Sequence, residues 1–163
     1  MNELLTWFGL KRQPLDKGIK ASTAIETTPL NEALARLDYI RQRGGMMLFT
    51  GDPGVGKTLA LRRFADSLSE TRYRTVYTPL TTLRGTDVLR HLSHLLGLRN
   101  QSSKATLFQQ LQQEILDSHE QKGRTVVLLI DEAQLLQTPA LHELRILTNF
   151  KMDSFDPFVL VLA

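Results

Sequence analysis

The chain has 163 residues, of which 42% are hydrophobic and 23% charged, a balance typical of one soluble globular domain. It contains no cysteine, which excludes disulfides, thiolate metal sites and a cysteine nucleophile. The net charge of +3, with 17 acidic residues among 20 basic ones, permits nucleic-acid binding without indicating it. The sequence begins without the pattern of a signal peptide and has no apolar run near the ~18 residues of a membrane span, so we expect a cytoplasmic protein.

Residues 1–29 are predicted to form an arm that lies over the rest of the chain, with a short helix at residues 3–8. Trp7 and Phe8 are interpreted either as a hydrophobic plug or as a contact for an adenine ring. A helix is predicted from about residue 30 to 43, because its apolar residues recur at the spacing of one helical face and two glycines end it. The main domain is therefore expected over residues 30–163.

A strand and a glycine-rich turn follow this helix. Residues 46–50 are apolar on both faces, which predicts a strand covered by helices on both sides. The pattern G-x-x-x-x-G-K-[ST] is then met by Gly51, Gly56, Lys57 and Thr58. Such a turn directs its backbone N–H groups at a phosphate, and the helix predicted at residues 57–68 adds its positive N-terminal end. The sequence therefore predicts a phosphate-binding loop.

In this interpretation Lys57 reaches the β- and γ-phosphates of a nucleotide, and the hydroxyl of Thr58 holds Mg²⁺. The alternative is a plain turn with a solvated lysine, but a strand before the loop and a helix after it favour the phosphate site. The residues expected to bind nucleotide are Gly51, Asp52, Pro53, Gly54, Val55, Gly56, Lys57, Thr58 and Leu59.

The middle of the chain alternates between strand and helix. Residues 75–78 predict a short strand stopped by Pro79, and helices are predicted from residue 85 to 96 and from about 105 to 121. The side chains of three basic pairs earlier in the chain are either solvated or form a nucleic-acid stripe. These pairs are Arg41 with Arg43, Arg62 with Arg63, and Arg72 with Arg74. The four histidines, His91, His94, His119 and His142, do not have the spacing of a metal cluster.

The most apolar run, residues 125–130, predicts a central parallel strand that ends at Asp131 and Glu132. An aspartate at this position faces the phosphate loop and binds magnesium, and the glutamate after it can polarise the attacking water. The alternatives are a solvated pair that merely ends a strand, a switch with an inert Glu132, or a small-molecule kinase. Gln134 either senses the γ-phosphate or caps the next turn.

The last elements are a helix that begins with Thr138 as its cap and a buried strand at residues 158–163. The helix is expected to bury Leu141, Leu144, Ile146 and Leu147. Arg145 and Asn149, one turn apart, are either solvated or face a neighbouring subunit. Strands that alternate with helices predict an α/β fold with a parallel sheet.

The order of these motifs resembles the AAA+ ATPases of the general secretion pathway protein A (ExeA-like) group, which also includes ATP-dependent helper proteins of bacterial transposons. The matching segments are FGLKRQP, a helix ending in GG, MMLFTGDPGVGKT, VVLLIDEAQ and LHELRILTNF. The resemblance implies a three-layer α/β/α P-loop NTPase fold in which the last strand lies between the strands at residues 46–50 and 125–130. It implies ATP and Mg²⁺ as ligands, with Lys57 and Glu132 catalytic and Thr58 and Asp131 at the metal. The family usually has Pro-Phe where this chain has Pro14-Leu15.

The resemblance also implies parts that would follow Ala163: a polar sensor residue, an arginine finger and a helical lid. We therefore expect the N-terminal part of a longer protein, truncated before the lid, that acts as a homo-oligomer with the finger supplied in trans. The segment alone is expected to bind nucleotide with Mg²⁺ and to hydrolyse it slowly. Its partners are secretion-apparatus proteins, with possible association at the inner membrane, or DNA and a transposase; a nucleotide-dependent scaffold is a third interpretation.

Overall fold

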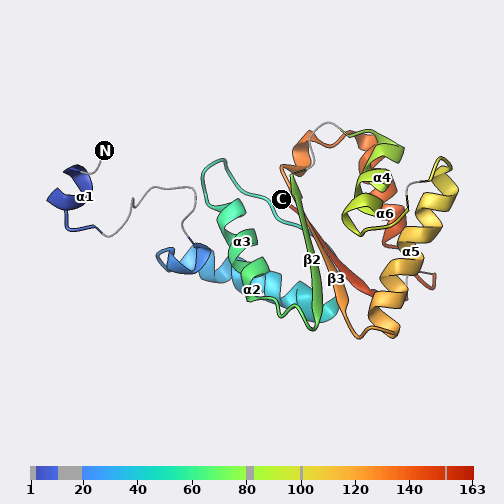
Figure 1. The fold of residues 1–163 in the computed structure, drawn as a ribbon, viewed down its shortest axis with the longest axis horizontal. Helices are drawn as coiled ribbons and strands as arrows, with labels where there is room; N and C mark the ends of the chain where they lie inside the picture. The colour runs from blue at the N-terminus through green and yellow to red at the C-terminus, as the bar shows by residue number, and fades with distance from the viewer. Residues whose placement is uncertain (1–2, 11–19, 80–82, 100, 153) are drawn as a thin grey trace.

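The structure, a computed structural model, describes residues 3–10, 20–79, 83–99, 101–152 and 154–163. Over these residues it contains a parallel four-stranded sheet with the order β1-β4-β3-β2, placed between two layers of helices (Figure 1). The strands are β1 (Gly45–Leu48), β2 (Tyr73–Pro79), β3 (Thr125–Asp131) and β4 (Phe158–Leu162). The α/β prediction is confirmed, and β4 lies between β1 and β3 as the resemblance implied.

Helices cover both faces of the sheet. Figure 1 shows α2 and α3 on one side and α4, α5 and α6 on the other. The helices are α1 (Glu3–Trp7), α2 (Thr28–Arg43), α3 (Lys57–Ser67), α4 (Gly85–Leu95), α5 (Lys104–Glu120) and α6 (Thr138–Leu147), with 3-10 turns η1 (Ala21–Thr23) and η2 (Ala133–Leu135). Among the described residues, no helix combines the length and apolar character that crossing a membrane requires.

The two central strands, β3 and β4, separate two apolar cores. Even-numbered residues of β3, such as Leu128 and Ile130, pack with α4, α5 and α6, whereas Val127 and Leu129 pack with α2 and α3. This alternation follows from the strand geometry, because successive side chains point to opposite faces of a sheet. All five residues of β4 are buried, and so are all those of β3 after Thr125. The unbroken apolar runs therefore correctly predicted strands covered on both faces.

β1 corrects the prediction that residues 46–50 are covered on both sides. It ends at Leu48, and the Met46 and Leu48 side chains are 46% and 68% exposed. Only Gly45 is buried, and Met47 is partly buried toward α2 and α3. In the described structure β1 pairs with β4 alone, so it is an edge strand. Apolar composition indicates a strand, but it does not tell an edge from the centre.

β2 is longer than predicted and includes the proline that was expected to stop it. It runs from Tyr73 to Pro79, and Pro79 lies in register with Asp131 of β3. Pro79 is tolerated because β2 is the other edge strand, where a residue without an N–H can face away from the ladder. This pairing brings the end of β2 beside the end of β3.

Three further predictions are wrong at single positions. Ile146 is 54% exposed and does not join the buried side of α6. Thr138 is the first residue of α6 rather than its cap, which is Gln137. Arg63 was expected to face water, but its guanidinium pairs with Glu26 at 2.7 Å and lies partly buried against the chain before α2.

From residue 20 onward, the segment before α2 lies over α3. Ala21 is 1% exposed, and α2 begins at Thr28, where the hydroxyl of Thr27 accepts the Leu30 N–H at 3.4 Å. Trp7 and Phe8 are 85% and 65% exposed, so they are not a buried plug, and α1 lies apart from the sheet in Figure 1. The expectation about Pro14-Leu15 falls outside the described residues.

Candidate functional site

The glycine-rich loop connects β1 to α3 and requires glycine for two different reasons. Gly54 and Gly56 have φ values of 84° and 94°, in the left-handed region that side chains disfavour. At Gly51 the constraint is space, because a Cβ there would lie 3.0 Å from Cγ2 of Val55. A Cβ at Gly54 or Gly56 would meet no protein atom within 4 Å, so the constraint at these two positions is the backbone conformation and not a lack of space.

Lys57 begins α3 and turns back over the loop. Its ammonium donates to the carbonyl oxygens of Gly51 and Asp52, at 2.7 and 3.2 Å. Asp52 and Pro53 are exposed in the turn itself, and Leu59 lies partly buried in the first turn of α3. The lysine is therefore placed at the mouth of the loop, beside the N-terminal end of a helix, where an anion is stabilised.

The next residue, Thr58, links the loop to the end of β3. Its hydroxyl donates to Oδ2 of Asp131 at 2.8 Å, although the two residues are 73 positions apart. Asp131 is only 4% exposed. A hydroxyl and a carboxylate oxygen are ligands that suit Mg²⁺, which usually takes one or two carboxylates together with phosphate and water. The residues present thus fit the predicted metal.

A third residue reaches the same carboxylate and was not predicted. The Tyr77 hydroxyl, on β2, donates to Oδ2 of Asp131 at 2.9 Å. Burial, and then this hydrogen bond to the carboxylate, raise the pKa of Tyr77 to about 12, so the phenol stays protonated. This contact depends on the pairing of β2 with β3. No pattern in the sequence predicts which strands pair, so the role of Tyr77 could not be predicted.

Glu132 follows Asp131 in a strained turn. Its φ is 58°, its backbone N–H donates to Oδ1 of Asp131 at 3.1 Å, and the N–H of Ala133 donates to the carbonyl of Ala163 at 2.7 Å. The Gln134 amide donates to Oε2 of Glu132 at 2.5 Å. Gln134 therefore holds the glutamate side chain, and among the described residues no side chain caps the start of this turn.

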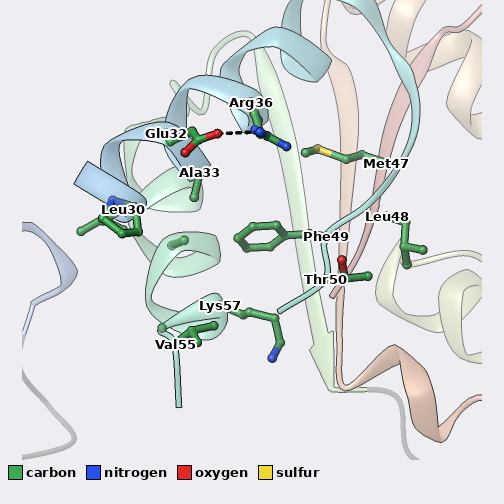
Figure 2. Close-up of a pocket in the computed structure, with 13 residues that line it drawn as sticks. Leu30, Glu32, Ala33, Arg36, Met47, Leu48, Phe49, Thr50, Val55 and Lys57 are labelled. Atoms are coloured by element: carbon green, nitrogen blue, oxygen red, sulfur yellow. Dashed lines mark hydrogen bonds and ion pairs between the residues drawn. The ribbon is translucent and has the colours of Figure 1, made fainter. Parts of the chain in front are cut away.

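A pocket of about 290 Å³ adjoins the loop between α2 and β1. Figure 2 shows the Met47 and Phe49 side chains directed toward α2, with Arg36 bonded to Glu32 above them and Lys57 below. The remaining lining includes Pro29, Leu30, Ala33, Val55 and Ala60. The pocket has apolar side chains between the Glu32–Arg36 pair on α2 and Lys57 at the loop. The sequence did not predict it, because its walls come from separate elements.

Two other groups of polar residues lie elsewhere. Arg145 and Asn149 line a different pocket, beside the first residues of β1. The glycine-rich loop follows the last residue of β1, so these two side chains lie at the opposite end of the strand from the loop. His91 shares a hydrogen bond of 2.9 Å with the Thr78 hydroxyl. Burial, and then the nearby His94, lower the pKa of His91 from its ordinary value.

The basic pairs are partly engaged within the domain. Arg41 bonds to Asp38 and to the Tyr73 hydroxyl. Arg74 pairs with Glu114 at 2.7 Å and donates to the carbonyl of Leu96. Together with Arg63, one member of each pair thus contacts an acidic group of its own chain, which does not favour a continuous nucleic-acid stripe.

Comparison with known proteins agrees with this arrangement. The AAA domain family matches residues 40–163. General secretion pathway protein A of Aeromonas hydrophila is 31% identical over 151 residues, which cover 90% of this chain and 27% of that protein. The crystal structure of Cdc6p from Pyrobaculum aerophilum superposes with a TM-score of 0.61 at 16% identity, over 90% of this chain and 40% of that one.

The chain therefore spans about a quarter of the length of the curated relative that it matches. The likeness to Cdc6p concerns the fold, and the family match covers the loop, Asp131 and Glu132. Taken with the loop between β1 and α3 and with β4 between β1 and β3, these matches show that the chain has a P-loop NTPase fold and belongs to the AAA domain family.

Proposed function

We propose that this chain binds ATP with Mg²⁺ and hydrolyses it, and that the energy drives assembly or regulation of a partner. The observation that supports this most directly is the contact between Thr58 and Asp131. It joins the residue after the loop lysine to the end of the central strand, where a nucleotide with its metal would need both groups. A glycine-rich turn without such a function has no need of a buried carboxylate beside it.

The positions of Lys57 and of the loop backbone support nucleotide binding. The Lys57 ammonium exchanges the carbonyls of Gly51 and Asp52 for the β- and γ-phosphate oxygens, and the loop N–H groups surround the β-phosphate. The pocket beside the loop takes the nucleobase, which packs against Phe49 and Met47. Its volume of about 290 Å³ lies near the low end of ligand pockets, which are roughly 300–1,000 Å³, and suits a base with part of its ribose.

Hydrolysis requires an oriented water and compensation of phosphate charge. Thr58 and Asp131 are the residues that would hold Mg²⁺, which supplies positive charge to the β- and γ-phosphate oxygens when it is bound. Glu132 accepts the proton of the attacking water once its carboxylate is released from Gln134. The backbone N–H of Glu132 donates to Oδ1 of Asp131, so the Asp131 carboxylate is held relative to the backbone from which the Glu132 side chain extends.

The wider role rests on the relative. Because General secretion pathway protein A carries a secretion name, we propose a secretion-pathway ATPase that acts as a homo-oligomer with an arginine finger from the neighbouring subunit. The alternative is a helper of transposition that binds DNA and a transposase. An ATP-dependent, salt-sensitive shift of duplex DNA would favour that alternative, and its absence would favour the secretion role.

The nucleotide proposal is tested with two variants and a fluorescent ATP analogue. Lys57→Ala should abolish binding, whereas Glu132→Gln should bind as tightly as the wild type and lose hydrolysis. Retained affinity in Lys57→Ala would contradict the loop assignment. Hydrolysis that survives in Glu132→Gln would assign water activation to another group, and transfer of phosphate to an added small molecule would indicate a kinase.

The isolated chain should turn ATP over more slowly than about 1 per second, the lower end of ordinary enzyme rates. Steady-state phosphate release measures this value. A faster rate would show that these 163 residues supply every group that hydrolysis needs. If the chain bound nucleotide but hydrolysed none under any condition, even with added partners, the result would support the interpretation as a nucleotide-dependent scaffold.

A further inference from the structure

The Asp131 carboxylate receives more hydrogen bonds than the phosphate-loop pattern explains. Oδ2 accepts from two hydroxyls, Thr58 at 2.8 Å and Tyr77 at 2.9 Å, and Oδ1 accepts the N–H of Glu132 at 3.1 Å. Thr58 belongs to the loop pattern and Glu132 follows directly in the chain. Tyr77 comes from a strand that contributes no other residue to the site, and neither the pattern nor the family comparison assigns it a role.

The sheet explains how Tyr77 reaches the carboxylate. β2 and β3 are parallel, with Tyr77 opposite Leu129 and Pro79 opposite Asp131. Tyr77 and Asp131 are therefore diagonal neighbours on the α2–α3 face, close enough for the tyrosine hydroxyl to reach the carboxylate at 2.9 Å. The ring is 41% exposed at the sheet edge, while the carboxylate that its hydroxyl contacts is 4% exposed.

This contact is not needed to hold β2 in the sheet. β2 is paired with β3 in an unbroken register from Tyr73 to Pro79, so the strand is fixed by its backbone. The hydroxyl instead acts on a carboxylate that would otherwise turn about its last bond. A side chain held from two sides presents its free lone pairs in one direction, which is what a metal ligand requires.

We propose that Tyr77 is a positioning residue that orients the Asp131 carboxylate toward Mg²⁺ and thereby sets the magnesium dependence of nucleotide binding. This inference rests on the nucleotide function proposed above. The Thr58 hydroxyl can contact the metal and still donate to Asp131, whereas the Tyr77 hydroxyl donates its one hydrogen to Oδ2 of Asp131 and so acts on the carboxylate. Outer partners of this kind usually change metal affinity by about 10- to 100-fold when they are removed.

Tyr73 supplies a matched control on the same strand and the same face. Its hydroxyl also makes a hydrogen bond, from Nη1 of Arg41 at 3.0 Å, but at the opposite end of β2. Tyr77→Phe and Tyr73→Phe therefore remove the same atom from the same strand. Any effect of losing a tyrosine hydroxyl on the strand itself should appear in both variants.

The experiment titrates a fluorescent ATP analogue against the wild type and both variants, first in EDTA and then at increasing Mg²⁺. We expect all three proteins to bind equally in EDTA, and Tyr77→Phe to need about tenfold more Mg²⁺ for half of the metal-dependent gain in affinity. Tyr73→Phe should follow the wild type throughout. Urea unfolding of both variants confirms that each is folded.

The outcomes separate the inference from the function on which it rests. If the wild type gains affinity with Mg²⁺ and Tyr77→Phe has the same magnesium midpoint, the positioning role is wrong although the nucleotide function stands. An equal shift in Tyr73→Phe, or a loss of binding by Tyr77→Phe in EDTA, would also overturn it, because a general structural effect would then explain the result. If the wild type binds no nucleotide in either condition, the proposed function itself fails.

Discussion

The left-handed backbone at Gly56 allows a test of the loop that does not depend on any ligand. Gly56 has φ 94° and ψ 22° and caps the start of α3, and a Cβ there would meet no protein atom within 4 Å. Gly56→Ala should therefore destabilise the fold through backbone conformation alone, by about 1–2 kcal/mol. For a domain of this size that corresponds to a fall in Tm of roughly 2–8 °C.

Gly85 provides the control, because it begins α4 outside the left-handed region and a Cβ there would make an ordinary contact of 3.8 Å with Pro139. Gly85→Ala should raise Tm by up to about 4 °C, since alanine is favoured over glycine in a helix by up to about 1 kcal/mol. Thermal unfolding followed by circular dichroism measures both variants. If Gly56→Ala unfolded at the wild-type temperature while Gly85→Ala rose as expected, the loop would not be held in its left-handed conformation.

Three further substitutions test the pocket, the site turn and the pH response. Phe49→Ala should weaken ATP binding by about 1–3 kcal/mol, the usual value of an aromatic ring stacked on a base, and leave tripolyphosphate binding unchanged in calorimetry; equal loss for both ligands would refute the base pocket. Gln134→Ala should leave ATP affinity unchanged and raise turnover by up to about fivefold, because one hydrogen bond of about 1 kcal/mol no longer holds the Glu132 carboxylate. A fall in turnover would instead mean that Gln134 holds the glutamate in its productive position. Because the pKa of His91 is lowered in the folded chain, folding favours its neutral form, and stability should be lost as pH falls through about 6.5 toward the folded pKa. Urea midpoints between pH 7 and 5 should fall less steeply in His91→Gln, and parallel slopes would contradict that reasoning.

The sequence predicted those parts of the fold that depend on local pattern. The apolar runs of β3 and β4 are buried on both faces of the sheet. A strand covered on both faces needs apolar residues at successive positions, so these two strands could be recognised from their composition. The loop is predictable because its left-handed positions need glycine. Asp131 could be placed at a strand end near the loop, because parallel strands deliver their carboxyl ends to one edge of the sheet.

What the sequence did not predict depends on which strands are neighbours. The position of β1 in the sheet decides whether Met46 and Leu48 are covered by helices. The same apolar sequence is compatible with an edge strand and with a central strand. The contact from Tyr77 to Asp131 arises from register between β2 and β3. The pocket beside the loop needs α2 and β1 to be placed together, so residues such as Phe49 carry no local signal of their role.

The two edges of the sheet differ in how they resist unwanted pairing. β2 ends in Pro79, a residue without an N–H that discourages another strand from adding to it. β1 has the sequence GMML, with neither a charge nor a proline, and its Met46 and Leu48 side chains are exposed at an edge that pairs with no further strand in the described part of the chain. An edge of that kind is a template for self-association. At high concentration the isolated chain should therefore aggregate through β1 rather than through β2, and a lysine introduced at Leu48 should keep it monomeric.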